Sequence, residues 1–184
     1  MPFLLIGLVL GGLGLYAFSR RGGENSALGM DDYIGSPDAA GDLADAVGWP
    51  YSYGAGAPNT PWSDGPAGVD CSGFVQMALV RLGLLSSSAT DRGAGTLADD
   101  SYPVEVGDQV PGDMAYYPGH IVLVVGYPDE DGHSAVMSAG GHATTKRDSP
   151  PWPVPGEEVK VHTSALYRDD FVTYMRLKSL VDVA

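Results

Sequence analysis

The order of the hydrophobic periods constrains the fold of this chain more than any other feature. Apolar residues at helical spacing come first, over residues 37–47 and 70–82. From residue 104 onward the period changes to that of strands, and five segments fit it: 114–117, 120–125, 134–138, 159–162 and 171–177. Helices followed by short strands are typical of α+β domains. The sequence therefore predicts N-terminal helices packed on a mostly antiparallel five-stranded sheet.

The first of these helices has a start and a stop signal. Ser36 can act as its N-cap, Pro37 suits the first helical position, and Gly48 follows its last turn. Leu43 and Val47 would form its buried face. After the second helix, which Gly83 should end, the polar residues 86–101 are predicted to be a connection.

The N-terminal segment is long enough to cross a membrane. Residues 1–19 carry no charged side chain, and as a helix they would span about 28 Å, close to the ~30 Å of a bilayer core. We expect residues 1–21 to form a transmembrane anchor, residues 22–35 a linker and residues 36–184 the folded domain. A cleaved secretion signal and a buried helix remain as alternatives. Arg20 and Arg21 follow the segment and favour a cytoplasmic location for what comes after them.

Charge and cysteine content exclude several classes of protein. The chain has 184 residues, 10 Lys+Arg against 23 Asp+Glu, and a net charge of -13 without a visible basic stripe. Nucleic acid is therefore not an expected partner. The single cysteine, Cys71, excludes an internal disulfide and a zinc site built from several thiolates.

Cys71 stands at the start of the second predicted helix, directly after Asp70. The N–H groups and the positive dipole end of a helix favour a thiolate, which makes this cysteine a candidate nucleophile. The alternative is a small buried apolar side chain.

A nucleophilic thiol needs a base, and the chain offers four histidines. His120 is the best placed, because it opens an apolar strand directly after the Pro118-Gly119 turn. For the other three we expect structural roles: His133, His142 and His162.

Four short motifs follow one another along the chain: GWPYSYG at 48–54, DCSGF at 70–74, PGD at 111–113 and GHIV at 119–122. In this order they resemble the motifs of the NlpC-type cell-wall peptidases. These papain-like cysteine hydrolases cut peptide bonds in bacterial peptidoglycan stems. The resemblance covers roughly residues 36–177 and implies a papain-like domain.

The resemblance implies a role for each matching residue. Cys71 would be the nucleophile, and His120 the base that later protonates the leaving amine. Tyr51 and the backbone N–H groups of Cys71 and Ser72 would stabilise the oxyanion. Asp70 would bind a substrate amine as well as cap the helix. No metal or organic cofactor is implied.

The residue that orients the base departs from the family pattern. The family usually has His, Asn or Gln on the next strand, whereas Ser138 holds that position here. His142 or a backbone carbonyl could orient His120 instead.

The expected function is therefore a peptidoglycan endopeptidase that forms an acyl-enzyme on Cys71. Its expected partners are peptidoglycan stem peptides, a membrane through residues 1–19, and other virion or envelope proteins. We expect it to be membrane-anchored, in a phage particle or in a bacterial envelope. Two alternatives stay open: an inert tethered protein for wall binding or virion assembly, and an amidase or acyltransferase with the same Cys-His pair.

Overall fold

The computed structural model describes residues 38–62, 68–140 and 157–181. The predicted anchor (1–21), the predicted linker (22–35) and His142 lie outside these residues. Within the described ranges, no helix has both the length and the apolar character needed to span a bilayer.

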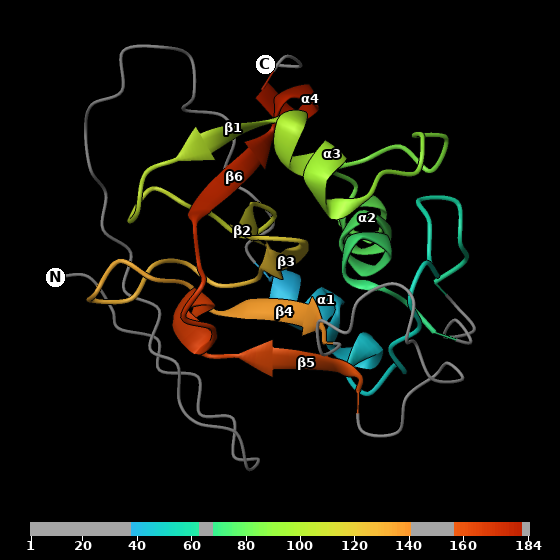
Figure 1. Cartoon of the computed structure of the whole chain (residues 1–184), viewed down its shortest axis with the longest axis horizontal. Coiled ribbons are helices and arrows are strands. Elements are labelled where there is room, and N and C mark those ends of the chain that lie inside the picture. The colour runs from blue at the N-terminus through green and yellow to red at the C-terminus, as the bar shows by residue number, and fades with distance from the viewer. Residues whose placement is uncertain (1–37, 63–67, 141–156, 182–184) are drawn as a thin grey trace, which may run out of the picture.

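One antiparallel sheet organises the domain (Figure 1). It has six strands in the order β1-β6-β2-β3-β4-β5, and every neighbouring pair is antiparallel. Their bounds are Ser101–Val104 (β1), Met114–Tyr117 (β2), His120–Val124 (β3), Val136–Ala139 (β4), Val159–His162 (β5) and Thr173–Leu177 (β6). The α+β class and the antiparallel sheet are confirmed, whereas the expected five strands are corrected to six.

The additional strand lies at the end of the stretch that we expected to be a connection. This stretch contains helix α3 (Ala94–Asp99), and its last residue, Ser101, begins β1, which pairs with β6 so that Ser101 faces Leu177. β1 is a four-residue edge strand that contains Pro103, and of its residues only Ser101 is buried. Because an edge strand needs neither alternation nor a full ladder of N–H donors, its sequence pattern is weak.

The second predicted helix forms as expected, and the first does not. Helix α2 spans Cys71–Arg81 and is followed by Gly83 at φ 73°, a conformation that suits glycine. The first helix is broken into α1 (Ala39–Asp42) and the 3-10 turn η1 (Ala44–Ala46). Leu43 is buried, but Val47 is 50% exposed, so the prediction that Val47 lies on the buried face is wrong.

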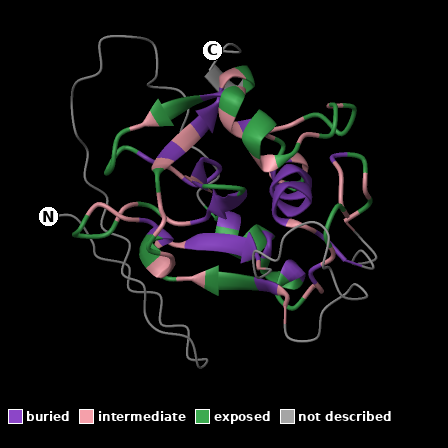
Figure 2. Ribbon diagram, viewed as in Figure 1, coloured by how far each residue is buried: buried purple, intermediate pink, exposed green. Residues whose placement is uncertain are grey.

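The sheet has a hydrophobic core on each face, and β3 contributes to both. Ile121 and Leu123 pack with the buried face of α2, while Val122 and Val124 pack with Tyr117 on the opposite face. This alternation is the period of a strand buried on both sides. Figure 2 shows α2 and the central strands as the most buried part of the domain.

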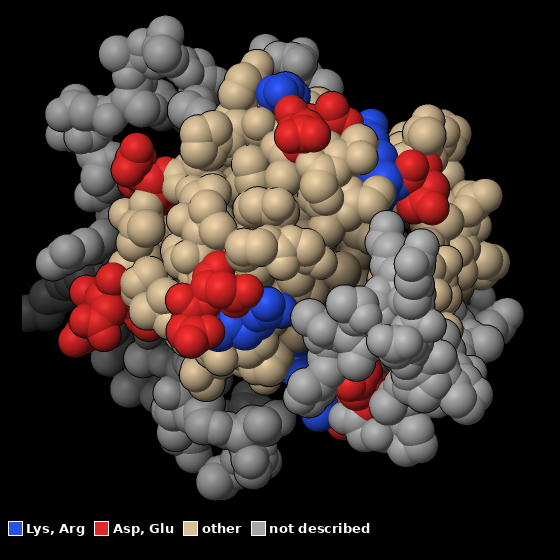
Figure 3. Space-filling view, viewed as in Figure 1, with Lys and Arg blue, Asp and Glu red and all other residues tan. Residues whose placement is uncertain are grey.

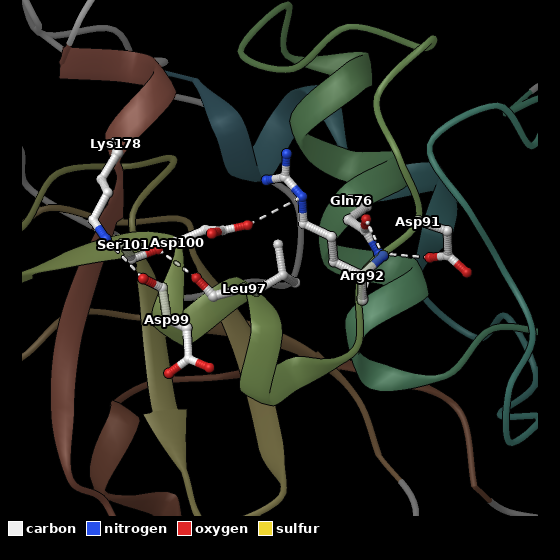
Figure 4. A network of polar contacts seen from close by, with 8 residues as sticks. All are labelled: Gln76, Asp91, Arg92, Leu97, Asp99, Asp100, Ser101 and Lys178. Carbon is white, nitrogen blue, oxygen red and sulfur yellow. Dashed lines mark hydrogen bonds and ion pairs between the residues drawn. The ribbon is translucent and has the colours of Figure 1, made fainter.

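A polar network fixes α3 and the segment before it against α2 (Figure 4). The buried side-chain amide of Gln76 donates to the Asp91 carboxylate at 3.0 Å and to the Arg92 carbonyl at 2.8 Å. Its oxygen accepts from the Arg92 N–H at 2.9 Å. Arg92 also pairs with Asp100 at 3.4 Å. Because two of these four contacts involve the backbone of Arg92, they fix the path of the chain and not only the side chains.

The surface of the domain is acidic, in keeping with the net charge. On the face drawn in Figure 3, acidic groups lie at several places around the rim, and basic groups lie beside acidic ones. Among the charged groups of the domain, Arg168 pairs with Asp170 at 2.6 Å. The described part of this face offers no basic patch to a polyanion.

Candidate active site

The start of α2 is capped by Asp70, as the sequence predicts. One oxygen of its carboxylate accepts the Gly73 N–H at 2.7 Å and the Ser72 hydroxyl at 3.1 Å. The other oxygen accepts the Gly54 N–H at 3.0 Å. Asp70 therefore stabilises the helix end and also ties the loop after Tyr51 to it.

Gly73 lets this loop pack directly on the helix. A Cβ atom at position 73 would lie 2.3 Å from the Ala55 carbonyl oxygen and 2.9 Å from the backbone of Gly56. Both neighbours are backbone atoms, which cannot move aside as a flexible side chain would. The DCSGF motif therefore needs glycine at position 73, because a side chain there would clash with the backbone of this loop.

Cys71 is the first residue of α2 and is only 9% exposed. Burial raises the pKa of its thiol, and the nearby Asp70 charge raises it further. Hydrogen bonds from the backbone N–H groups of Ile121, Ser72 and Cys71 itself lower this pKa. Because Ile121 is the second residue of β3, the sulfur lies beside the start of that strand. The thiol is therefore neutral at pH 7 and lies among backbone N–H donors.

Tyr51 lies within electrostatic reach of the thiol. Its backbone forms a parallel bridge with Val69, and its side chain is 8% exposed. Burial raises its pKa strongly, and charges on Cys71 and Asp70 add to the effect. The phenol therefore keeps its proton. Its hydroxyl can donate a hydrogen bond to a group bound near Cys71.

His120 opens β3, as the sequence predicts, and is 7% exposed. Its Nε2 atom lies 3.1 Å from the Tyr167 hydroxyl, and its ring lies 5.7 Å from the Tyr117 ring. Burial lowers its pKa to about 4, with a further contribution from the Arg168 charge. The imidazole is therefore neutral at pH 7, which is the form that accepts a proton.

Ser138 is buried on β4, and its hydroxyl lies 2.9 Å from Nε2 of His162. The described contacts of His120 Nε2 lead to Tyr167 and not to Ser138. The His162 ring stacks on Tyr167 with centroids 3.8 Å apart and planes 11° from parallel. His162 thus contacts both Ser138 and Tyr167, although we expected only a structural role for it from the sequence.

Tyr167 is the other residue that sequence reasoning missed. It ends the 3-10 turn η2 (Ala165–Tyr167), which follows β5 and has no recognisable motif. A charge on Cys71 would raise its pKa, so Tyr167 lies within electrostatic reach of both the thiol and His120.

The remaining described histidine lies elsewhere. Nδ1 of His133 lies 3.3 Å from the Tyr174 hydroxyl, and its ring contacts Phe171. Among the described residues, no three His, Cys, Asp or Glu side chains are placed to hold a metal ion.

The structure therefore brings Tyr51, Asp70, Cys71 and Ser72 together at the start of α2, next to the start of β3. A thiol and several N–H and O–H donors meet there, and the neutral imidazole of His120 is connected to this group through Tyr167, which lies within electrostatic reach of the thiol. This combination suits nucleophilic attack on a carbonyl group.

Comparisons with known proteins concern the family and the fold. The sequence model of the NlpC/P60 family matches residues 48–148. No curated protein sequence matches the chain. The P60 domain of antigen MAP1204 from M. avium subspecies paratuberculosis is similar in structure, with a TM-score of 0.50 and 19% identity over 76% of this chain and 91% of that one. An NLP/P60 family protein similar to lipoprotein, SAV0400 from Staphylococcus aureus, has a TM-score of 0.49 and 16% identity over 84% of this chain and 45% of that one.

Proposed function

The chain belongs to the NlpC/P60 family of cell-wall hydrolases, and on that premise we propose that it is a cysteine endopeptidase that cleaves stem-peptide amide bonds of peptidoglycan. The observation that carries the proposal is the position of Cys71 at the capped start of α2, beside the strand that a neutral His120 opens.

In the proposed mechanism, Cys71 and His120 start as a neutral pair. Because Nε2 of His120 is engaged by Tyr167, Nδ1 is the nitrogen available to the thiol. It takes the thiol proton as the sulfur attacks the carbonyl carbon. Tyr51 and the N–H groups of Cys71 and Ser72 donate to the resulting oxyanion.

The second half of the reaction reverses the proton transfer. The C–N bond breaks, the leaving amine takes the proton from His120, and a thioester remains on Cys71. Neutral His120 then takes a proton from water, whose oxygen attacks the thioester carbon, and the thiol leaves with that proton.

Among the described residues, three donors reach the Asp70 carboxylate: the N–H of Gly73, the hydroxyl of Ser72 and the N–H of Gly54. An ionised carboxylate has about four acceptor positions. The remaining position could accept the free amino group of a stem peptide. This supports the proposal that Asp70 helps bind the substrate.

The proposal is tested with purified peptidoglycan and the full-length protein. An endopeptidase releases new amino termini from within the stem peptides, and mass spectrometry of the soluble products identifies the bond. An amidase would instead release whole stem peptides from the sugar chain. An inert wall-binding protein would bind the polymer without releasing any amine, and that result would contradict the proposal.

For its location, we propose that residues 1–21 anchor the enzyme in a membrane, either in a phage particle or in a bacterial envelope. The length and apolar character of residues 1–19 support the anchor. Arg20 and Arg21 favour a cytoplasmic location for the domain, whereas peptidoglycan lies outside the membrane, and a virion setting removes this conflict. Detection of the protein in purified particles, or only in cell envelopes, separates the two.

The acid limb of the pH profile of kcat/KM should lie at lower pH than it would for an ordinary histidine base. His120 must be neutral to accept the thiol proton, so activity is lost as the pH falls through its pKa. Since burial and the Arg168 charge lower that pKa to about 4, activity at pH 5.5 should nearly equal that at pH 7. An ordinary histidine, with a pKa of about 6.5, would already be mostly protonated there.

The Arg168→Gln variant provides the matched control for this profile. Removing the Arg168 charge should raise the pKa of His120 and move the acid limb to higher pH. Asp170 and His162 also act on His120, in opposite directions, and both remain in this variant. A wild-type acid limb at pH 6.5 or above would contradict the neutral-pair mechanism.

A further inference from the structure

Tyr167 reaches His120 from a part of the chain that no motif marks. The turn η2 lies between β5 and β6 (Figure 1), and its first residue, Ala165, packs in the core on the sheet face away from α2. On β3, Val122 and Val124 belong to the same core. By strand alternation His120 points to that face, where the Tyr167 hydroxyl meets its Nε2 atom at 3.1 Å.

The position of this hydroxyl is set by contacts other than its bond to His120. The Tyr167 ring stacks on His162 at 3.8 Å and meets the edge of the Tyr117 ring at 5.7 Å. The Tyr117 hydroxyl donates to the Ala165 carbonyl at 2.6 Å, which fixes the turn itself. Arg168 lies over the Tyr117 ring at 5.2 Å. Because these contacts hold the Tyr167 hydroxyl in place, it can orient the imidazole of His120.

The hydrogen bonds around Tyr167 form one connected series. If Nδ1 of His120 is to accept the thiol proton, the ring proton is on Nε2 and is donated to the Tyr167 oxygen. The Tyr167 hydroxyl is also hydrogen-bonded with Ser138, which lowers the pKa of Tyr167. The Ser138 oxygen in turn lies 2.9 Å from Nε2 of His162. Neighbouring bonds in such a series polarise one another.

We propose that Tyr167 is the positioning residue for His120, and that Ser138 and His162 act on His120 only through Tyr167. The inference rests on the proposed function of the Cys71 site. It also assigns a different role to Ser138. The family resemblance predicts that Ser138 orients His120 directly, whereas in this proposal Ser138 supports Tyr167, and Tyr167 orients His120. The Tyr167 oxygen fixes the tautomer of His120 and stabilises the imidazolium that forms during attack.

The Tyr167→Phe variant tests this directly, because it removes the hydroxyl and keeps the ring that stacks on His162. We expect kcat to fall about 10- to 100-fold with KM within about two-fold, as for the loss of a hydrogen bond to a charged group. Ser138→Ala should also lower kcat, by a smaller factor. In the Tyr167→Phe background, Ser138→Ala should lower kcat by a still smaller factor.

Tyr174→Phe is the matched control. Its hydroxyl is also buried against a histidine, His133, and accepts the Ser134 N–H at 3.1 Å, but it lies outside the Cys71 site. This variant loses a comparable buried hydroxyl and should leave kcat within about two-fold of wild type.

Nitrogen-15 NMR of the histidine rings provides a readout that needs no substrate. Wild-type His120 should be in the Nε2–H form at pH 7, and Tyr167→Phe should weaken that preference while Tyr174→Phe leaves it unchanged. A kcat for Tyr167→Phe within two-fold of wild type, or an Nδ1–H form in the wild type, would overturn the proposal. If the wild type does not cleave peptidoglycan, the proposed function fails, while the tautomer measurement still decides the role of Tyr167.

Discussion

Replacing Cys71 with alanine is expected to lower kcat/KM for peptidoglycan cleavage by about a million-fold, which leaves only background release of amines. The variant loses the only nucleophilic thiol in the chain, so no acyl-enzyme can form. The donors around the sulfur, among them the Ile121 N–H, would still bind the carbonyl but could not replace the missing bond. Soluble products released from purified peptidoglycan over time, resolved by chromatography and mass spectrometry, measure the loss.

Cys71→Ser is the matched control for this loss. It keeps the size and the hydrogen-bonding positions of the side chain but replaces the thiol with a hydroxyl, which neutral His120 deprotonates far less readily. We expect it to be as inactive as Cys71→Ala, and both variants to unfold within a few degrees of the wild type. Activity in folded Cys71→Ala would show that the chemistry takes place at another site.

The parts of the site that the sequence predicts correctly depend on short-range rules. Asp70 caps α2 because a carboxylate at the N-cap reaches the N–H three residues later, and the Asp70–Gly73 bond of 2.7 Å follows from that spacing. His120 opens β3 because a Pro118-Gly119 turn precedes an apolar run, and Gly119 takes up φ 73° there. Both features are visible within five residues of sequence.

The partner of His120 could not be predicted in the same way. Tyr167 is 47 residues from His120, and the two meet only because β4 and β5 extend the sheet and η2 then folds back over its face. Ser138 has the spacing expected for the orienting residue, yet its hydroxyl lies against His162, which is 24 residues away. Side-chain pairing across a sheet depends on the strand order, which local patterns do not contain.

The structure gives a physical reason for the Pro111-Gly112-Asp113 motif. The Asp113 carboxylate is fully buried at the start of β2, where it pairs with Arg176 of β6 through two bonds of 2.7 Å. It also accepts the Val110 N–H at 2.9 Å. Gly112, at φ 105°, donates to the Val124 carbonyl on β3. The motif thus joins three strands, among them the one that carries His120.

Arg176→Met is accordingly expected to lower the free energy of unfolding by about 3 to 5 kcal/mol. The substitution keeps an apolar side chain on β6 but leaves Asp113 buried without its cation. Burial already raises the pKa of Asp113 against the effect of Arg176, so the unpaired carboxyl would take up a proton or remain charged at high cost. Urea denaturation at pH 7, followed by circular dichroism, gives the value from the shift in midpoint at constant slope.

Two further variants isolate the cause of this loss. Combining Arg176→Met with Asp113→Asn removes the unpaired charge and keeps an acceptor for the Val110 N–H, so it should recover part of the stability. Lys160→Met breaks an exposed pair with Glu158 at 3.7 Å and should change the unfolding free energy by less than about 1 kcal/mol. If Arg176→Met cost no more than Lys160→Met, the Asp113–Arg176 pair would contribute no more than a surface contact. The position of β3 relative to β2 and β6 would then depend on the apolar cores alone.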